Sequence, residues 1–249
     1  MNRPGNSTTD RAPTGPPLGV LALVSTALLV AGVGGGAAVA GRPYPSPFAD
    51  PEAIQQYFAT QALATMVNAV AVFGSAVPLL IYAATVSARL RQLGVTAPGA
   101  TIALAGGVAA AVLLALSGLL QWTLARPTVV EARPLVRALH DLSFLTGGPA
   151  HVVFLGLLVA GVAVPGLLLG LLARPLAVAG LVIAALCELS TLALIWPTLA
   201  VLVPIGRFPA LAWLVAAGFL LPRRRRREHP DRAQPSPSSP GRSAKESST

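Results

Sequence analysis

Long runs of apolar residues alternate along this chain with short stretches that carry nearly all of its charges. A helix needs about 20 apolar residues to cross the hydrocarbon of a bilayer. Because the runs are continuous and do not alternate between apolar and polar positions, they favour helices over a membrane β-barrel. The pattern predicts an all-α integral membrane protein, a bundle of about six transmembrane helices at residues 18–40, 57–86, 100–125, 141–164, 173–203 and 206–222.

Two of these runs are longer than a bilayer requires. The second and fifth helices are therefore expected to tilt or bend, with Pro78 and Pro197 as natural break points. The first run has a competing interpretation, because small residues at 38–41 resemble the cleavage site of a signal peptide. Its apolar stretch is long for a signal peptide, so we expect a retained helix whose Gly32 and Gly36 allow close packing against a neighbour.

The composition of the whole chain supports the membrane interpretation, and the two terminal segments differ from the rest in composition. Hydrophobic residues make up 54% of the chain and charged residues only 11%, whereas soluble domains have about 25% charged residues. Residues 1–17 and 223–249 are rich in polar, Pro and Gly residues and have too little apolar surface to offset ordering entropy. We predict that both are disordered tails flanking a membrane domain at 18–222.

The Lys and Arg residues predict the orientation. They are more numerous in the segments that share a side with both termini, so the positive-inside rule places both termini in the cytoplasm. In this topology Arg207 falls in a connection on the outer side, and Trp122 and Trp196 lie at the outer ends of their helices. The basic run after the last helix is expected to contact anionic lipid headgroups at the cytoplasmic face, with no role in nucleic-acid binding; it consists of Arg223, Arg224, Arg225, Arg226 and Arg227.

Small and polar residues recur at helical spacing in four of the predicted helices, which predicts faces that point into the bundle. The aligned sets are Gln61, Thr65, Asn68, Val72 and Ser75; Gly107, Ala110, Leu114, Ser117 and Gln121; His140, Phe144, Gly147 and His151; and Ala177, Gly180, Ala184, Glu188 and Thr191. Close helix packing explains the small residues in these sets. The ionisable residues need a further explanation, because an unpaired charge inside a bilayer costs several kcal/mol.

Three of the polar side chains are expected to lie at a similar depth in the membrane. At 1.5 Å per residue, Asn68, His151 and Glu188 reach similar depths below the outer interface, so we predict that they form a buried polar cluster. Four further residues would form its outer rim, namely Gln121, Arg137, His140 and Asp141. Such a cluster is either a hydrogen-bonded connection between helices or a proton-coupled or ligand-binding site, and the sequence leaves both open.

The sequence contains none of the common catalytic or nucleotide-binding motifs. It has one cysteine, Cys187, and lacks nucleotide-binding loops, serine-hydrolase elbows and zinc-binding motifs. His140 and His151 would lie about 16 Å apart along one helix, which is too far to hold one haem between them. We therefore expect no metal, no cofactor and no enzymatic activity, although an intramembrane hydrolase using His151 as its base is not excluded.

Three segments carry a resemblance to a known class of proteins: "FGSAVPLLIYAATVSARLRQLGV", "ALHDLSFLTGGPAHVVFLGLLVAGVAVP" and "RFPALAWLVAAGFLLP". Over residues 50–222 the chain resembles small bacterial multi-pass inner-membrane proteins with a domain of unknown function. The resemblance implies an all-helical protein of the bacterial cytoplasmic membrane, and it brings no known catalytic residues.

Two functions remain in competition. The short connections and small-residue faces favour an accessory protein that binds another membrane protein or a second copy of itself. The intramembrane Glu188 and His151 instead favour a small-solute or proton-coupled transporter, or a subunit of one.

Overall fold

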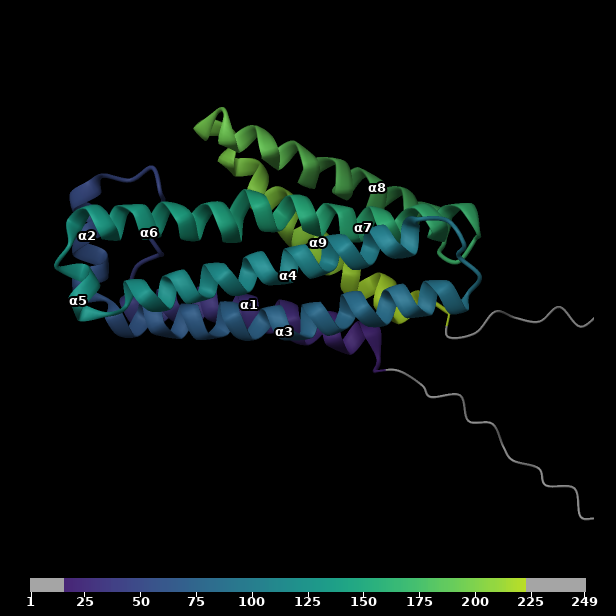
Figure 1. The fold of residues 1–249 in the computed structure, drawn as a ribbon, viewed down its shortest axis with the longest axis horizontal. Coiled ribbons are helices and arrows are strands. Elements are labelled where there is room, and N and C mark those ends of the chain that lie inside the picture. The colour runs from purple at the N-terminus through teal and green to yellow at the C-terminus, as the bar shows by residue number, and fades with distance from the viewer. Residues whose placement is uncertain (1–15, 223–249) are drawn as a thin grey trace, which may run out of the picture.

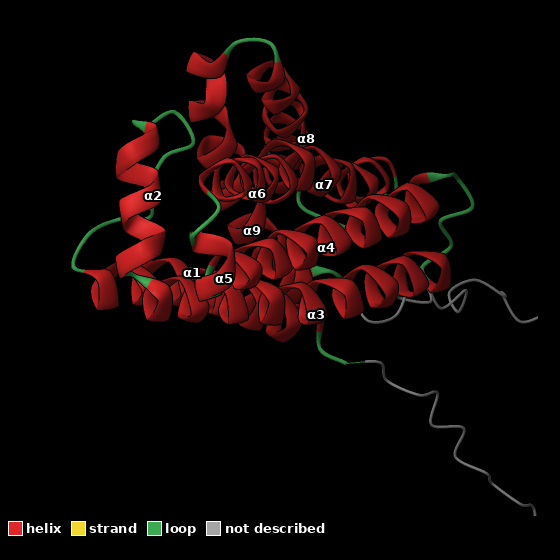
Figure 2. Cartoon of the chain, turned by 60° about the vertical axis from the view of Figure 1, so that its left-hand side comes forward, coloured by secondary structure: helices red, strands yellow, loops and turns green. Residues whose placement is uncertain are grey.

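The computed structural model describes residues 16–222, and every regular element in that range is a helix (Figures 1 and 2). Six segments are long and apolar enough to cross a membrane: 18–40, 62–92, 99–124, 133–168, 174–194 and 197–220. This confirms the predicted all-α bundle, and the protein is a multi-pass membrane protein. The helices are α1 (Leu18–Ala40), α2 (Pro51–Thr60), α3 (Ala62–Gln92), α4 (Gly99–Leu124), α5 (Pro127–Val130), α6 (Arg133–Leu145), η1 (Thr146–Ala150), α7 (His151–Leu168), α8 (Arg174–Leu189), η2 (Ser190–Leu194), η3 (Pro197–Val201) and α9 (Leu202–Leu220).

The first and third spans match the predicted ranges closely, and the second begins later than predicted. Tyr57 belongs to the separate helix α2, which begins at Pro51 after Asp50 has capped it through the amides of Glu52 and Ala53. The expected break at Pro78 is wrong, because α3 continues through this residue as one helix.

The last two spans meet at a different place from the predicted one. Helix α8 ends at Leu189, the chain turns at 195–196, and Pro197 begins the next helical segment. Pro197 is thus a true break point, and the predicted fifth helix to residue 203 was too long. As a consequence Arg207 lies inside α9, so its assignment to an outer connection was wrong.

The spans pack in an order that closes on itself. Helix α1 contacts α3, α3 contacts α4, α4 contacts α7, α7 contacts α8, and α9 contacts both α8 and α1. Glycines allow the closest approaches. Gly32 and Gly36 of α1 are buried against Ala71 and Ala64 of α3, which confirms the predicted close-packing surface.

A layer of short elements covers one end of the bundle. Helices α2 and α5 and the loop at residues 41–50 lie there, and we call this the capped end (Figure 1). A small apolar core holds the layer in place and consists of Ile54, Tyr57, Phe58, Leu124 and Val136. The opposite end, which we call the loop end, holds the 93–98 connection and both ends of the described chain.

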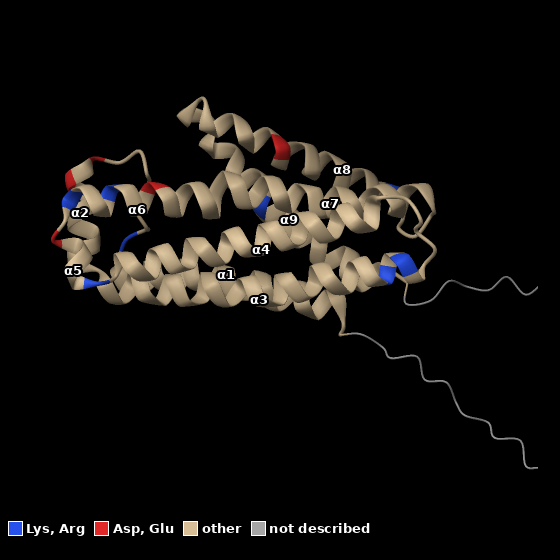
Figure 3. Ribbon diagram, in the orientation of Figure 1, with Lys and Arg blue, Asp and Glu red and all other residues tan. Residues whose placement is uncertain are grey.

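Charges are distributed differently at the two ends (Figure 3). At the loop end the structure shows Arg89, Arg91 and Arg174 and no acidic residue in the described range. Acidic and basic residues are mixed at the capped end. Within residues 16–222, Arg207 is the one cation in the middle of the bundle (Figure 3).

Candidate functional site

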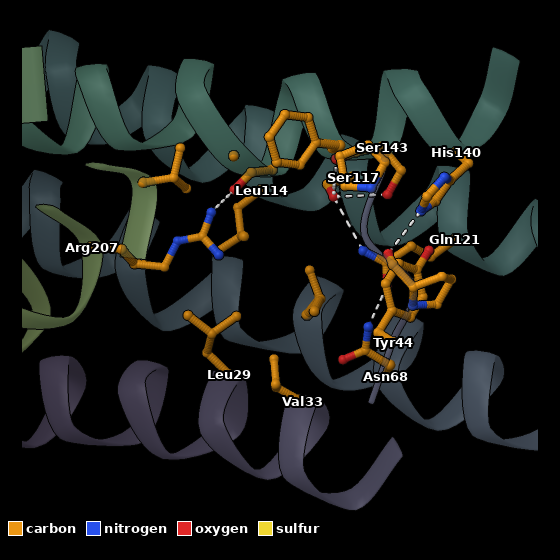
Figure 4. A pocket seen from close by; sticks show the side chains of 17 residues that line it. Leu29, Val33, Tyr44, Asn68, Leu114, Ser117, Gln121, His140, Ser143 and Arg207 are labelled. Carbon is orange, nitrogen blue, oxygen red and sulfur yellow. Dashed lines mark hydrogen bonds between the residues drawn. The ribbon is translucent and has the colours of Figure 1, made fainter. Parts of the chain in front are cut away.

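A cavity of about 250 Å³ lies between the helices, below the loop at residues 41–50 (Figure 4). Arg207 lies at one end of it, and a group of neutral polar side chains lies at the other. Leu29, Val33 and Leu114 line the space between them. The remaining lining residues are Tyr44, Pro45, Pro47, Asn68, Val72, Ser117, Gln121, His140, Ser143, Phe144, Gly147, Gly148 and Val203.

The neutral end is a chain of hydrogen bonds across three helices. Asn68 of α3 donates through Nδ2 to Gln121 Oε1 of α4 at 2.6 Å, and Gln121 Nε2 donates to Ser117 Oγ at 3.2 Å. Ser117 Oγ in turn donates to the carbonyl oxygen of Ser143 on α6 at 2.8 Å. Asn68 Oδ1 takes no part in these bonds and is buried without a partner. The chain therefore ends in a free acceptor.

His140 adds a second free acceptor to the same end. Its Nε2 lies 3.2 Å from the carbonyl oxygen of Pro45. A carbonyl oxygen can only accept, so Nε2 carries the proton and Nδ1 of the neutral ring has a lone pair. That Nδ1 atom is buried and makes no hydrogen bond within the described structure.

The loop at residues 41–50 is fastened over the cavity. Arg137 Nη2 donates to the carbonyl oxygen of Pro47 at 2.9 Å, and His140 holds Pro45. Tyr44 packs edge-on against Tyr57 and Phe58, with 5.7 Å between ring centroids in each pair. Burial raises the pKa of the Tyr44 phenol, so the phenol stays neutral. The loop thus forms a wall of the cavity held by named contacts.

An irregular turn in the fourth span provides the backbone acceptor for Arg207. Pro149 has no backbone N–H, and the segment Thr146–Ala150 forms one π-helical turn between α6 and α7. The N–H of His151 bonds to the carbonyls of Thr146 and Gly148 and leaves the Gly147 carbonyl without that donor. Arg207 Nη2 of α9 donates to the Gly147 oxygen. The Gly-Gly-Pro sequence therefore opens a backbone acceptor inside the bundle, and Arg207 uses it.

The Arg207 charge is not balanced by any acidic side chain in the cavity. A guanidinium has five N–H donors and stays charged in proteins. Arg207 Nε is buried with no partner, and the one ion pair in the described range joins Arg137 to Asp141 at 3.0 Å. The cavity thus has a cation at one end with spare donors.

The structure divides the predicted polar cluster. Asn68, Gln121 and His140 do come together, at the neutral end of the cavity. His151 is fully buried but lies outside the cavity lining, because its Nδ1 donates to the Ala110 carbonyl of α4 at 2.9 Å. The part of the prediction that pairs His151 with Asn68 is therefore not what the structure shows.

Glu188 also departs from the predicted cluster. Its stripe on α8 is buried at Ala177, Gly180 and Ala184, but Glu188 itself is exposed. The reason is its position around α8, because the neighbouring Cys187 takes the inward position and is fully buried against Gly156 of α7 and Gly206 of α9. One carboxylate oxygen lies near Gly156 of α7, so the side chain lies along the outside of the bundle.

The other predicted contacts lie away from the cavity. Arg137 and Asp141 form an exposed ion pair at the capped end and do not line the cavity. Arg223 to Arg227 lie outside the described residues, so their predicted contact with lipid headgroups stays a prediction. In residues 16–222 no group of three or more His, Cys, Asp or Glu side chains is arranged to hold a metal ion.

Sequence reasoning missed the position of Arg207 inside the bundle and the contact made by Ser143. Arg207 was placed in a connection because the fifth run was read through Pro197. Proline is common in the first turn of a helix, and taking Pro197 as a helix start would have put Arg207 ten residues into the last span. Ser143 gave no such signal, because its contact with Ser117 depends on how two helices pack.

Comparison with known proteins adds no relative to this picture. No family model matches the chain, and no curated protein or solved structure matches it either.

Proposed function

We propose that the protein is a membrane transport protein, or a subunit of one, for a small solute that binds in the cavity between Arg207 and Asn68. The cavity carries this proposal, since it holds unpartnered polar atoms at membrane depth, where empty space would normally be apolar. No catalytic triad or metal site lies among the lining residues, so we propose binding without covalent chemistry.

The interrupted helix beside the cavity supports a transport role. Transporters often place their substrates where membrane helices are broken, because the freed backbone groups can serve as ligands. Here the π-helical turn at Thr146–Ala150 borders the cavity, because Gly147 and Gly148 line it.

The distribution of charge supports a topology for the transporter. Arg89 and Arg91 at the end of α3 and Arg174 at the start of α8 lie at the loop end, which the positive-inside rule places in the cytoplasm. We therefore propose a protein of the bacterial cytoplasmic membrane with both termini inside and the capped end outside. In this orientation the cavity lies in the outer half of the bundle, below the loop at 41–50.

A matched pair of cysteine variants tests whether water reaches the cavity. In a Cys187→Ala background, Ser143→Cys would place a thiol in the cavity, and Ser87→Cys would place one at the packed contact of α3 with Ala100. Both serines are 3% exposed, so exposure alone does not distinguish them. We expect the anionic reagent 2-sulfonatoethyl methanethiosulfonate to label the first variant at least about tenfold faster in proteoliposomes, because only its thiol adjoins a hydrated space. Equal, slow labelling of both would contradict a solute cavity.

One observation favours the accessory role as a second candidate. Glu188 is an exposed carboxylate on a membrane-spanning helix that diverges from the bundle. Lipid is a costly environment for that group, and a helix from another membrane protein would supply hydrogen-bond donors. If water-soluble reagents label neither cysteine, and the protein co-migrates with a membrane partner only when Glu188 is intact, the accessory role replaces the transport proposal.

A further inference from the structure

The class of solute follows from the balance of charge in the cavity. Arg207 is a permanent cation, and the acidic residues of the described range lie at the capped end or, for Glu188, on the outside of α8. An isolated charge in a low-dielectric interior is strongly unfavourable, and an opposite charge brought by a ligand removes much of that cost. One cation balances one negative charge, so the site matches a monoanion.

The donors of Arg207 point to the type of anion. Its Nη2 is engaged by the Gly147 carbonyl, and Nε is buried without a partner. The guanidinium presents its N–H groups as a planar fork that fits the two oxygens of a carboxylate. A ligand carboxylate would use the Nη hydrogens that the Gly147 carbonyl leaves free.

The opposite end of the cavity demands a hydrogen-bond donor. Asn68 Oδ1 and His140 Nδ1 are both acceptors, both buried, and both without a partner. Asn68 is 6% exposed and His140 is 1% exposed, so bulk water does not serve them freely. A ligand hydroxyl would donate its one hydrogen to Asn68 Oδ1, and its oxygen can accept from the Tyr44 hydroxyl, which is also buried without a partner and lines the cavity.

The walls and the volume limit the size of the ligand. Aliphatic side chains line the space between the two polar ends (Figure 4), and these suit a short hydrocarbon chain. At about 30 Å³ for each water-sized unit, 250 Å³ holds on the order of eight non-hydrogen atoms.

We propose that the cavity binds a small hydroxylated monocarboxylate, with its carboxylate on Arg207 and its hydroxyl on Asn68. This inference rests on the proposed function, because it names the substrate class of the same site. It makes Arg207 the residue that selects charge and Asn68 the residue that selects the hydroxyl.

The test is equilibrium binding of radiolabelled 4-hydroxybutyrate to the purified full-length protein in detergent, with unlabelled competitors. We expect competition by 4-hydroxybutyrate, about tenfold weaker competition by butyrate, and none by butylammonium or chloride at equal concentration. Arg207→Gln is expected to weaken binding by about 30-fold or more, because the ligand charge would then lack its partner. Arg207→Lys should weaken it less, since it keeps the charge but loses the fork.

Two further variants serve as comparisons. Glu188→Gln removes the other intramembrane ionisable side chain of the described α8–α9 region but does not touch the cavity, so it should bind as the wild type does. Asn68→Ala should remove the preference for 4-hydroxybutyrate over butyrate. The competition pattern is measured on the wild-type protein. It therefore tests the ligand class even if an Arg207 variant fails to fold.

The inference fails if butylammonium or chloride competes as well as the carboxylates, or if Arg207→Gln folds and binds with unchanged affinity. No binding of any carboxylate, together with fast labelling of Ser143→Cys, would overturn the ligand class and leave the transport proposal standing. No binding together with slow labelling of Ser143→Cys would overturn both.

Discussion

Leucine in place of Gly161 is expected to lower the midpoint of thermal unfolding by about 10 °C or more. A β-carbon at Gly161 of α7 would lie 2.5 Å from the backbone nitrogen of Ala103 and 2.8 Å from the carbonyl oxygen of Gly99, both on α4. Backbone atoms of a packed helix cannot move aside as a flexible side chain can. Overpacking typically costs about 1–3 kcal/mol and more for larger insertions, and 1 kcal/mol corresponds to about 2–4 °C in a chain of this size.

The same substitution at Gly34 is the matched control. Gly34 is also a helical glycine in a span, but no heavy atom lies within 4 Å of its ideal β-carbon position. We expect Gly34→Leu to leave the midpoint within about 2 °C of the wild type. Unfolding followed by circular dichroism in one detergent measures both variants. Equal midpoints for the two variants would mean that α4 and α7 do not pack as closely as described.

Valine in place of Gly147 is expected both to destabilise the bundle and to disrupt the cavity. A β-carbon at Gly147 would overlap Ser117 Oγ and lie 2.7 Å from Ser117 Cβ. Relief of this contact requires the π-helical turn to move away from α4. That movement would displace the carbonyl oxygen that accepts from Arg207 and would break the contact between Ser117 and Ser143. We expect a loss of about 1–3 kcal/mol of stability and an altered labelling rate of Ser143→Cys.

Gly74→Val is the control for this variant, because the nearest heavy atom to its ideal β-carbon position is Leu28 Cδ1 at 4.0 Å. It should unfold at the temperature of the wild type and leave the labelling rate of Ser143→Cys unchanged. A Gly147→Val protein with wild-type stability and labelling would show that the turn and α4 are not in contact.

Helical periodicity predicted which faces point inward, because burial in a bundle follows the 3.6-residue repeat. Thr65, Asn68 and Ser75 of α3 are buried as expected, and Ser117 and Gln121 of α4 are buried beside them. The bond from Asn68 to Gln121 joins two residues that the sequence had put in one neighbourhood. Periodicity and depth were sufficient here because both helices run straight across the bundle side by side.

The same reasoning failed at Glu188 and Arg207 for reasons that lie outside any single helix. Glu188 has the right spacing for an inward face, but Cys187 takes the inward position at this level of α8, and Glu188 points outward. Arg207 was hidden by the apolar run that continues from α8 through Pro197 into α9. The rotation of a helix about its axis and the place of a tight turn depend on tertiary packing, and hydropathy carries little information about either.

The most direct test of the intramembrane anion site is crystallography with a ligand that carries an anomalous scatterer. Crystals grown with trans-3-bromoacrylate, whose vinylic bromine is not displaced, should show a bromine peak in the space lined by Leu29 and Leu114, with the carboxylate oxygens on Arg207. The Gly147 carbonyl should remain bonded to the same guanidinium. An empty or purely apolar cavity, with Arg207 turned toward Glu188 or toward solvent, would contradict the account.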